Sequence, residues 1–169
     1  MNDLPAVQAN VTHRLLQPQE VEKFLGLSPE NLRDQRRRGI LDGIGQAEAG
    51  SGRWRYSADD VLIIAIAQVL FQEGIDLPSA MSIAKFAAPN VIECWSYGDR
   101  SAYPNPILVA FPGRVGMNVV RWTDPEMVAS INALVSYRID IRQITERLSK
   151  RVWKLVMAAD VNDDAESDQ

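Results

Sequence analysis

Two short stretches with helical spacing lie close together near the start of this sequence, and they constrain its fold more than any other feature. The first stretch, residues 16–27, places apolar side chains at Val21, Phe24 and Leu25, where they would share one face of a helix. Gly26 then interrupts the pattern. The spacing therefore predicts one short helix that ends in a tight turn.

The second stretch, residues 28–39, carries signals for both a helix start and a helix stop. Ser28 is a favoured N-cap residue, and Pro29 suits the first helical position because an N–H would have no partner there. Gly39 is expected to end this helix. Two short helices joined by a turn of about three residues are typical of a helix-turn-helix.

A glycine-rich segment, a basic aromatic stretch and a long apolar helix are expected next. Residues 42–52 are predicted to be a flexible loop that forms no packed element, and residues 53–56 to be extended. A capping box made by Ser57 and Asp60 is expected to start an apolar helix that ends at Gly74.

Residues 15–87 reproduce a specific order of short motifs. The motif residues are Leu25-Gly26-Leu27-Ser28, Leu32-Arg33, Arg38-Gly39-Ile40-Leu41, Gly52, Arg53, Arg55, Tyr56, Ser57, Asp59, Asp60, Val61, Gly74, Ile75 and Leu77. Their order and spacing resemble the DNA-binding domain of the MerR family. The resemblance implies a winged helix-turn-helix domain over residues 15–97, in which helix 29–38 enters the major groove of DNA and a wing supports it. The family usually has aromatic residues after its Leu-Arg motif, where this chain has Asp34, Gln35 and Arg36.

The candidate DNA-contacting residues lie on the second helix and on the expected wing. They are Ser28, Asn31, Arg33, Arg36, Arg37, Arg38, Arg53, Trp54 and Arg55. At about 100° per residue, Arg33 and Arg37 are expected to face the groove. Arg36 and Arg38 are expected to reach phosphates from the edge of the helix.

On the expected wing, Arg53 and Arg55 suit contacts with phosphates or with a minor groove. Trp54 has two interpretations, because it could pack on the DNA backbone or cover the protein core. Tyr56 precedes the Ser57 cap and is interpreted as a hydrophobic staple.

The sequence changes character after the first domain. A short helix over 78–87 is followed by Pro89, which is expected to separate it from one further short helix. A domain boundary is expected in residues 98–104, which are rich in Gly, Ser and Pro. Residues 1–14 are expected to form a flexible N-terminus.

Residues 98–159 are predicted to form a small α/β unit with antiparallel strands, which makes the chain mainly α with a small β part. Strands are expected at 107–111, 115–122 and 134–141, followed by one helix over 142–159. An exposed sheet edge favours pairing with a second copy, or with another protein. The basic side of the last helix is either a second nucleic-acid surface or a solvated face. A set of aromatic residues either lines a ligand pocket or fills the core: Trp95, Tyr97, Tyr103, Trp122 and Trp153.

The net charge of −4 is unevenly distributed along the chain. Residues 160–169 hold five acidic residues and no basic one, so the rest of the chain sums to +1. Residues 31–56 hold six arginines against three acids, a local charge of +3. A local basic patch, more than the total charge, indicates a nucleic-acid surface. The acidic segment is expected to be a disordered tail, and a DNA-mimicking brake is the alternative.

Several classes of protein are not expected. The single cysteine, Cys94, cannot form an internal disulfide, and one cysteine with one histidine makes a zinc site improbable. No catalytic motif is found, so neither an enzyme nor a cofactor is predicted. No apolar run reaches the roughly 20 residues of a membrane span, and the N-terminus lacks the pattern of a signal peptide. A cytoplasmic protein of the bacterial nucleoid is expected.

Three functional hypotheses follow from the sequence. The leading one is a bacterial or phage transcriptional regulator that binds double-stranded DNA as a homodimer, with no catalytic, metal or cofactor role. The second is an accessory DNA-binding protein of phage, recombination or DNA packaging. The third is a protein-interaction adaptor that has lost DNA binding, which the missing aromatic residues and the overall acidity support.

Overall fold

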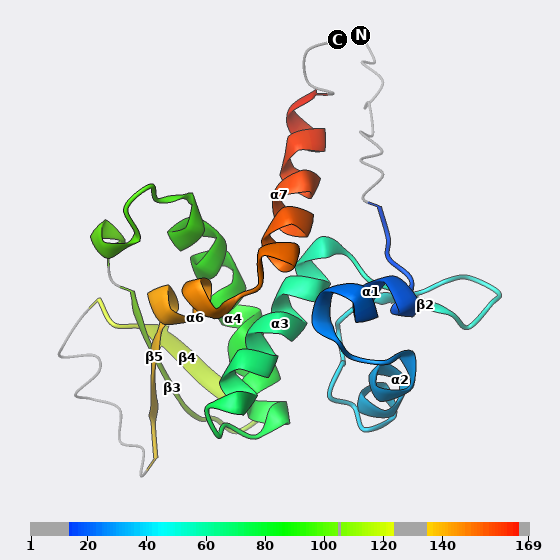
Figure 1. The fold of residues 1–169 in the computed structure, drawn as a ribbon. Helices are drawn as coiled ribbons and strands as arrows, with labels where there is room; N and C mark the ends of the chain where they lie inside the picture. Colours follow the sequence, from blue (N-terminus) through cyan, green and yellow to red (C-terminus); the bar gives the residue numbers. More distant parts are fainter. Residues whose placement is uncertain (1–13, 105, 124–134, 166–169) are drawn as a thin grey trace, which may run out of the picture.

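The computed structural model describes residues 14–104, 106–123 and 135–165 (Figure 1). The described chain is mainly helical, with two small antiparallel sheets. Its elements are α1 (Pro18–Leu25), α2 (Pro29–Arg37), β1 (Gln46–Ala47), β2 (Trp54–Arg55), α3 (Ala58–Gln72), α4 (Leu77–Ser96), the 3-10 helix η1 (Arg100–Ala102), β3 (Ile107–Pro112), β4 (Met117–Arg121), β5 (Tyr137–Asp140), α6 (Ile141–Arg147) and α7 (Lys150–Ala165). Helices α3 and α4 lie at the centre, between α1 and α2 on one side and the larger sheet on the other (Figure 1).

The predicted helix pair is confirmed by α1 and α2. Gly26 ends α1 in the left-handed conformation, with φ of 68°. The Ser28 hydroxyl accepts a hydrogen bond from the Asn31 backbone N–H at 3.2 Å, as an N-cap should. Gly39 has φ of 73° and lies one residue beyond Arg38, the residue that caps α2. Local capping chemistry was therefore sufficient to place both helices.

The prediction of an unpacked loop at 42–52 is wrong in its first half. Gln46 pairs with Arg55 and Ala47 with Trp54, so β1 and β2 form a short hairpin. Ile44 is only 1% exposed and belongs to the core. Gly45 explains the close approach, because a Cβ there would lie 2.8 Å from the Arg55 carbonyl oxygen.

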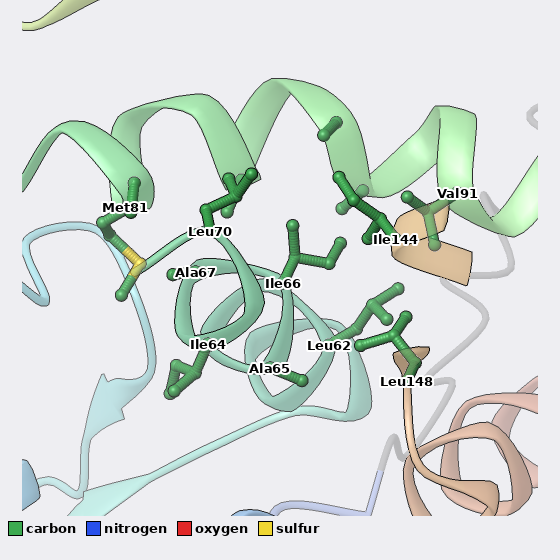
Figure 2. Packing of buried hydrophobic residues seen from close by; sticks show 14 of the residues in the cluster. Leu62, Ile64, Ala65, Ile66, Ala67, Leu70, Met81, Val91, Ile144 and Leu148 are labelled. Atoms are coloured by element: carbon green, nitrogen blue, oxygen red, sulfur yellow. The ribbon is translucent and has the colours of Figure 1, made fainter. Parts of the chain in front are cut away.

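Helix α3 begins at the predicted capping box and forms the middle of the core. The Asp60 N–H donates to the Ser57 hydroxyl at 3.1 Å, and the Ser57 N–H donates to the Asp60 carboxylate at 2.8 Å. An apolar helix of this kind must be covered on most sides. Figure 2 shows Ile66 and Leu70 directed towards α4, with Ile144 in the same cluster.

Pro89 does not divide α4, so the prediction of two short helices is wrong. The helix runs from Leu77 to Ser96 with the proline inside it. Proline removes one helical hydrogen bond, but buried positions continue on both sides of it, at Ala84 and Ala87 before it and at Val91 and Cys94 after it. Burial of one continuous apolar stripe therefore outweighs the local break.

The predicted strands are confirmed in order, with different ends. The sheet has the order β4-β3-β5, and both neighbours of β3 run antiparallel to it. Leu108 and Ala110 are fully buried on the face covered by α4. Ile141, expected as the end of the last strand, instead begins α6, because the Asp140 side chain caps that helix by accepting from the Arg142 N–H at 2.9 Å.

The expected single helix over 142–159 is two helices in the structure. Leu148 is extended, with φ of −65° and ψ of 135°, and Ser149 accepts from the Val152 N–H at the start of α7. Helix α7 runs on to Ala165, beyond the start at 160 expected for a disordered tail. Residues 166–169, and residues 1–13 of the expected flexible N-terminus, lie outside the described residues.

One hydrophobic cluster connects the two expected domains. It contains Leu16 and Leu32 from the N-terminal part, the inner sides of α3 and α4, and Ile139 and Trp153 from the C-terminal part. The segment 98–104 thus lies between a mainly helical part and a part that contains strands, and the two parts share one core.

Candidate functional site

A groove of about 690 Å³ lies between the start of α1, helix α2 and strand β2. Its lining residues are Gln17, Pro18, Gln19, Pro29, Leu32, Arg33, Arg36, Arg37, Gly52, Arg53, Trp54, Arg55 and Tyr56. Five of these residues are arginines and none is acidic. The groove therefore combines positive charge from two elements that are about twenty residues apart in sequence.

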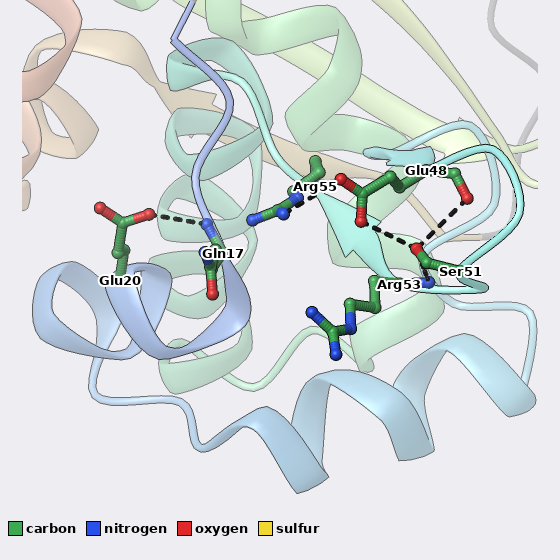
Figure 3. Close-up of polar contacts among 6 residues, drawn as sticks. All are labelled: Gln17, Glu20, Glu48, Ser51, Arg53 and Arg55. Atoms are coloured by element: carbon green, nitrogen blue, oxygen red, sulfur yellow. Dashed lines mark hydrogen bonds and ion pairs between the residues drawn. The ribbon is translucent and has the colours of Figure 1, made fainter.

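Arg33 and Arg53 are the two exposed groove arginines without an intramolecular ion pair among the described residues. Arg33 lies on α2 and Arg53 directly precedes β2. The Arg53 side chain extends from the hairpin towards α2 (Figure 3). Both guanidinium groups can therefore donate to an anionic ligand without first giving up a partner.

Arg36 is turned into the protein, although the sequence assigned it to a DNA phosphate. Its guanidinium carbon lies 3.3 Å from the centroid of the Trp54 ring. Its Nη2 donates to the Ile44 carbonyl at 2.7 Å and to the Tyr56 hydroxyl at 3.4 Å, and its Nη1 donates to the Leu41 carbonyl at 3.3 Å. These contacts join α2, the 41–44 turn and β2 through one side chain.

Asp34 holds two arginines on the outer side of α2. Arg37 Nη2 lies 2.9 Å from Asp34 Oδ1, and Arg38 Nη2 lies 2.8 Å from Asp34 Oδ2. The three side chains are all substantially exposed, so each pair is weak and can be exchanged for another partner. Arg37 lines the groove, whereas Arg38 does not.

Arg55 is paired within the hairpin. Its Nη2 lies 3.2 Å from Glu48 Oε1, and the Ser51 hydroxyl donates to Glu48 Oε2 at 2.8 Å (Figure 3). The hydrogen bond from Ser51, followed by the bond and charge of Arg55, lowers the pKa of the Glu48 carboxyl below its ordinary value of 4.5. Glu48 therefore stays ionised and neutralises part of the charge on this side of the groove.

The structure brings most of the predicted contact residues together. Arg33, Arg36, Arg37, Arg53, Trp54 and Arg55 all line the groove. Ser28 and Asn31 lie outside it and are engaged in the N-cap of α2. Trp54 is partly buried against the core, which agrees with the second of its two interpretations. Sequence reasoning missed the start of α1, residues 17–19, because no local signal places it opposite β2.

Tyr56 ties the hairpin to the chain that precedes α1. It is 1% exposed, and its backbone exchanges two hydrogen bonds with Leu16, at 2.8 and 3.0 Å. It thus packs inside the protein, and its role as a hydrophobic staple at the start of α3 stays a prediction.

The structure also places other residues that the sequence singled out, away from the groove. Trp95 and Trp153 stack at 4.0 Å between ring centroids, and Trp153 is buried in the core. A second cavity of about 350 Å³ lies beside β5 and contains the Arg147–Glu73 ion pair. Cys94 is buried, and burial raises the pKa of its thiol.

Two further properties concern only the part of the chain that the structure describes. There, acidic residues, histidine and cysteine form no cluster that could hold a metal ion. In the same residues, no helix is both long enough and apolar enough to cross a membrane. Arg147 and Arg151 of the basic last helices are engaged with Glu73 and with the Lys23 carbonyl.

No family model and no curated protein matches this chain. The resemblance of residues 15–87 to the MerR DNA-binding domain therefore stays an interpretation of motif order and spacing. The arginine-lined groove is formed by the same segments that carry those motifs.

Proposed function

We propose that this chain is a sequence-specific DNA-binding protein, a bacterial or phage transcriptional regulator with a MerR-like winged helix-turn-helix. In this proposal α1 and α2 are the helix-turn-helix and the β1–β2 hairpin is the wing. Helix α2 enters the major groove, and the hairpin contacts the adjacent phosphates.

The observation that carries the proposal is the groove of about 690 Å³, which has five arginines and no acidic residue in its lining. A polyanion with phosphates on both sides of a groove is the partner that this arrangement suits. Arginine pairs with guanine O6 and N7 or clamps a phosphate, so the same residue type serves both readout and positioning.

The residues have different roles in this proposal. Arg33 reaches a base edge or phosphate from α2, and Arg53 grips a phosphate from the hairpin. Arg37 leaves its exposed pair with Asp34 to reach the DNA, at a cost of about 0–1 kcal/mol. Trp54 covers the core and stacks on Arg36, so it is not assigned a DNA contact.

A homodimer is part of the proposal. In the described part of the sheet, β4 and β5 each pair on one side only, with β3. An open sheet edge suits pairing with a second copy, and a dimer would read two half-sites related by symmetry.

Selection of bound sequences from a random duplex library tests the proposal most directly. The selected duplex should then be titrated at several salt concentrations, and its affinity should fall steeply as salt rises because phosphate contacts release counterions. A library from which no sequence is enriched, together with no duplex binding at low salt, would contradict the proposal.

A specific observation keeps the protein-interaction adaptor as a second candidate. Asp34 and Glu48 neutralise Arg37, Arg38 and Arg55 within the protein itself. An acidic peptide could pair with the remaining groove arginines, Arg33 and Arg53, just as DNA could. Binding to an acidic peptide that a DNA duplex fails to displace would favour the adaptor.

A further inference from the structure

The most heavily engaged side chain of the groove is Arg36. One face of its guanidinium covers the Trp54 ring at 3.3 Å, and both terminal nitrogens donate to oxygens of the same chain. Its Nε is buried and has no hydrogen-bond partner among the described residues. An arginine has five N–H donors in a planar fork, and here both terminal nitrogens of the fork make hydrogen bonds to the protein. These nitrogens and the stacked face are therefore engaged before any ligand binds.

The hairpin that Arg36 contacts is too short to fix its own orientation. Strands β1 and β2 have two residues each. A two-stranded hairpin without further packing is marginally stable in water. The direction of Arg53, which directly precedes β2, therefore depends on what holds Trp54.

Helix α2 also has few anchors of its own. Leu32 is its one buried residue. The Arg36–Trp54 stack joins this helix to β2, and the bond to the Ile44 carbonyl joins it to the turn before β1. The stack therefore sets the distance between the two sides of the groove.

We propose that Arg36 is a positioning residue, which fixes the β1–β2 hairpin against α2 so that Arg33 and Arg53 face one ligand, and which does not itself contact DNA. This inference rests on the proposed function for the identity of the ligand. The fixing of the hairpin can be measured without any ligand, so the two proposals can fail separately.

The first experiment compares amide hydrogen exchange in the free wild-type chain and in Arg36→Met. Methionine keeps much of the length of the side chain and removes the planar charged fork. Loss of the stack and of three hydrogen bonds should speed exchange at residues 46–55 by about tenfold. Amides of α3 should keep their wild-type rates. Unchanged exchange at residues 46–55 would overturn the inference.

Two more variants make the exchange experiment specific. Arg36→Lys keeps the charge but cannot form the flat stack or the fork of donors, so it should behave like Arg36→Met. Trp54→Leu removes the other side of the same contact, and it serves if Arg36→Met does not fold. Arg114→Met makes the same chemical change at an exposed arginine of the β3–β4 turn, outside the groove, and should change nothing.

The second experiment measures duplex affinity against salt for a mixed-sequence duplex. Arg36→Met should weaken binding several-fold and leave the slope of log K against log salt at its wild-type value. Arg53→Ala, which removes a phosphate contact, should make that slope shallower by about 0.9. A slope that falls by this amount in Arg36→Met would show a direct phosphate contact and overturn the inference, although the proposed function would stand. A wild-type chain that binds no duplex would refute the proposed function, and the exchange experiment would still decide the role of Arg36.

Discussion

The centre of the molecule and the arginine-lined groove are held together by different kinds of contact. Helix α3 buries seven side chains, and all of them are apolar. Helix α2, which forms one wall of the groove, buries only Leu32. The groove is held instead by a stacked arginine, three hydrogen bonds and exposed ion pairs.

This difference separates the contacts that set the fold from those that set the shape of the site. Removal of apolar volume from the centre should destabilise the whole chain, because one hydrophobic cluster connects its two parts. Replacement of a groove arginine should leave the fold in place and change what the groove binds. The variants below test this division.

The largest effect is expected for Ile66→Ala at the centre of the core. Ile66 is fully buried on α3 and is directed towards α4 (Figure 2). Truncation should lower the free energy of unfolding by about 2–5 kcal/mol, measured by chemical denaturation. Because the core is shared, the transition should stay single. Val115→Ala, at a residue that is 93% exposed, is the control, with an effect within about 0.5 kcal/mol. Two separate transitions would show that the two parts of the chain unfold independently.

The next effect concerns binding. Arg33→Ala should weaken binding to the selected duplex by about 1–3 kcal/mol where Arg33 reads a base, and leave the free energy of unfolding within about 0.5 kcal/mol of the wild type. Fluorescence anisotropy and denaturation measure the two quantities on the same samples. Arg114→Ala is the matched control outside the groove. Equal affinities for Arg33→Ala and the wild type would remove Arg33 from the interface.

The sequence predicted the parts of the fold that depend on local chemistry. Ser28, Gly26 and the Ser57–Asp60 box placed three helix ends, because capping needs only neighbouring residues. The two errors in helix length have different causes. Burial of a continuous apolar stripe outweighed the break at Pro89, whereas the cap at Ser149 is a local signal that helical spacing alone did not detect.

The residue types of the site could be predicted from the sequence, but the contacts of each arginine could not. The cluster of arginines and the basic stretch after the glycine-rich segment supplied six of the nine predicted residues to the groove lining, and Ser28, Asn31 and Arg38 lie outside it. Which arginine is free and which is engaged depends on partners as far away as Trp54, eighteen residues after Arg36 in sequence. Helical spacing put Arg36 at the edge of the helix, but it could not show the Trp54 ring beneath its guanidinium.

A smaller effect is expected for Asp34→Asn. The change releases Arg37 and Arg38 from exposed pairs at 2.9 and 2.8 Å, and it removes one negative charge beside the groove. Exposed pairs contribute about 0.2–1 kcal/mol, so duplex affinity should rise by about two- to fivefold. Glu146→Gln removes one negative charge from an exposed site on α6 and should leave the affinity unchanged. A fall in affinity for Asp34→Asn would mean that Asp34 positions the two arginines for the ligand.

The smallest effect is the titration of Glu48, which tests whether the hairpin side of the groove is neutralised from within. Its pKa lies below 4.5 because Ser51 and Arg55 stabilise the carboxylate. A carboxyl whose folded pKa is depressed contributes stability above its unfolded pKa, and this contribution is lost as pH falls through the folded value. The hairpin should therefore keep the Glu48–Arg55 pair at neutral pH and lose it only in acid.

Carboxyl-carbon NMR measures this titration residue by residue. Ser51→Ala should raise the Glu48 midpoint towards 4.5, because the hydroxyl at 2.8 Å is the largest cause of the shift. Ser96→Ala, which removes an exposed hydroxyl bonded to the Ile92 carbonyl on α4, should leave the Glu48 midpoint where it is. A Glu48 midpoint that already lies at 4.5 in the wild type, and that Ser51→Ala leaves unchanged, would mean that neither Ser51 nor Arg55 holds the carboxylate. Arg55 would then join Arg33 and Arg53 as an unpaired cation of the groove, and the positive charge offered to a ligand would be larger than these contacts indicate.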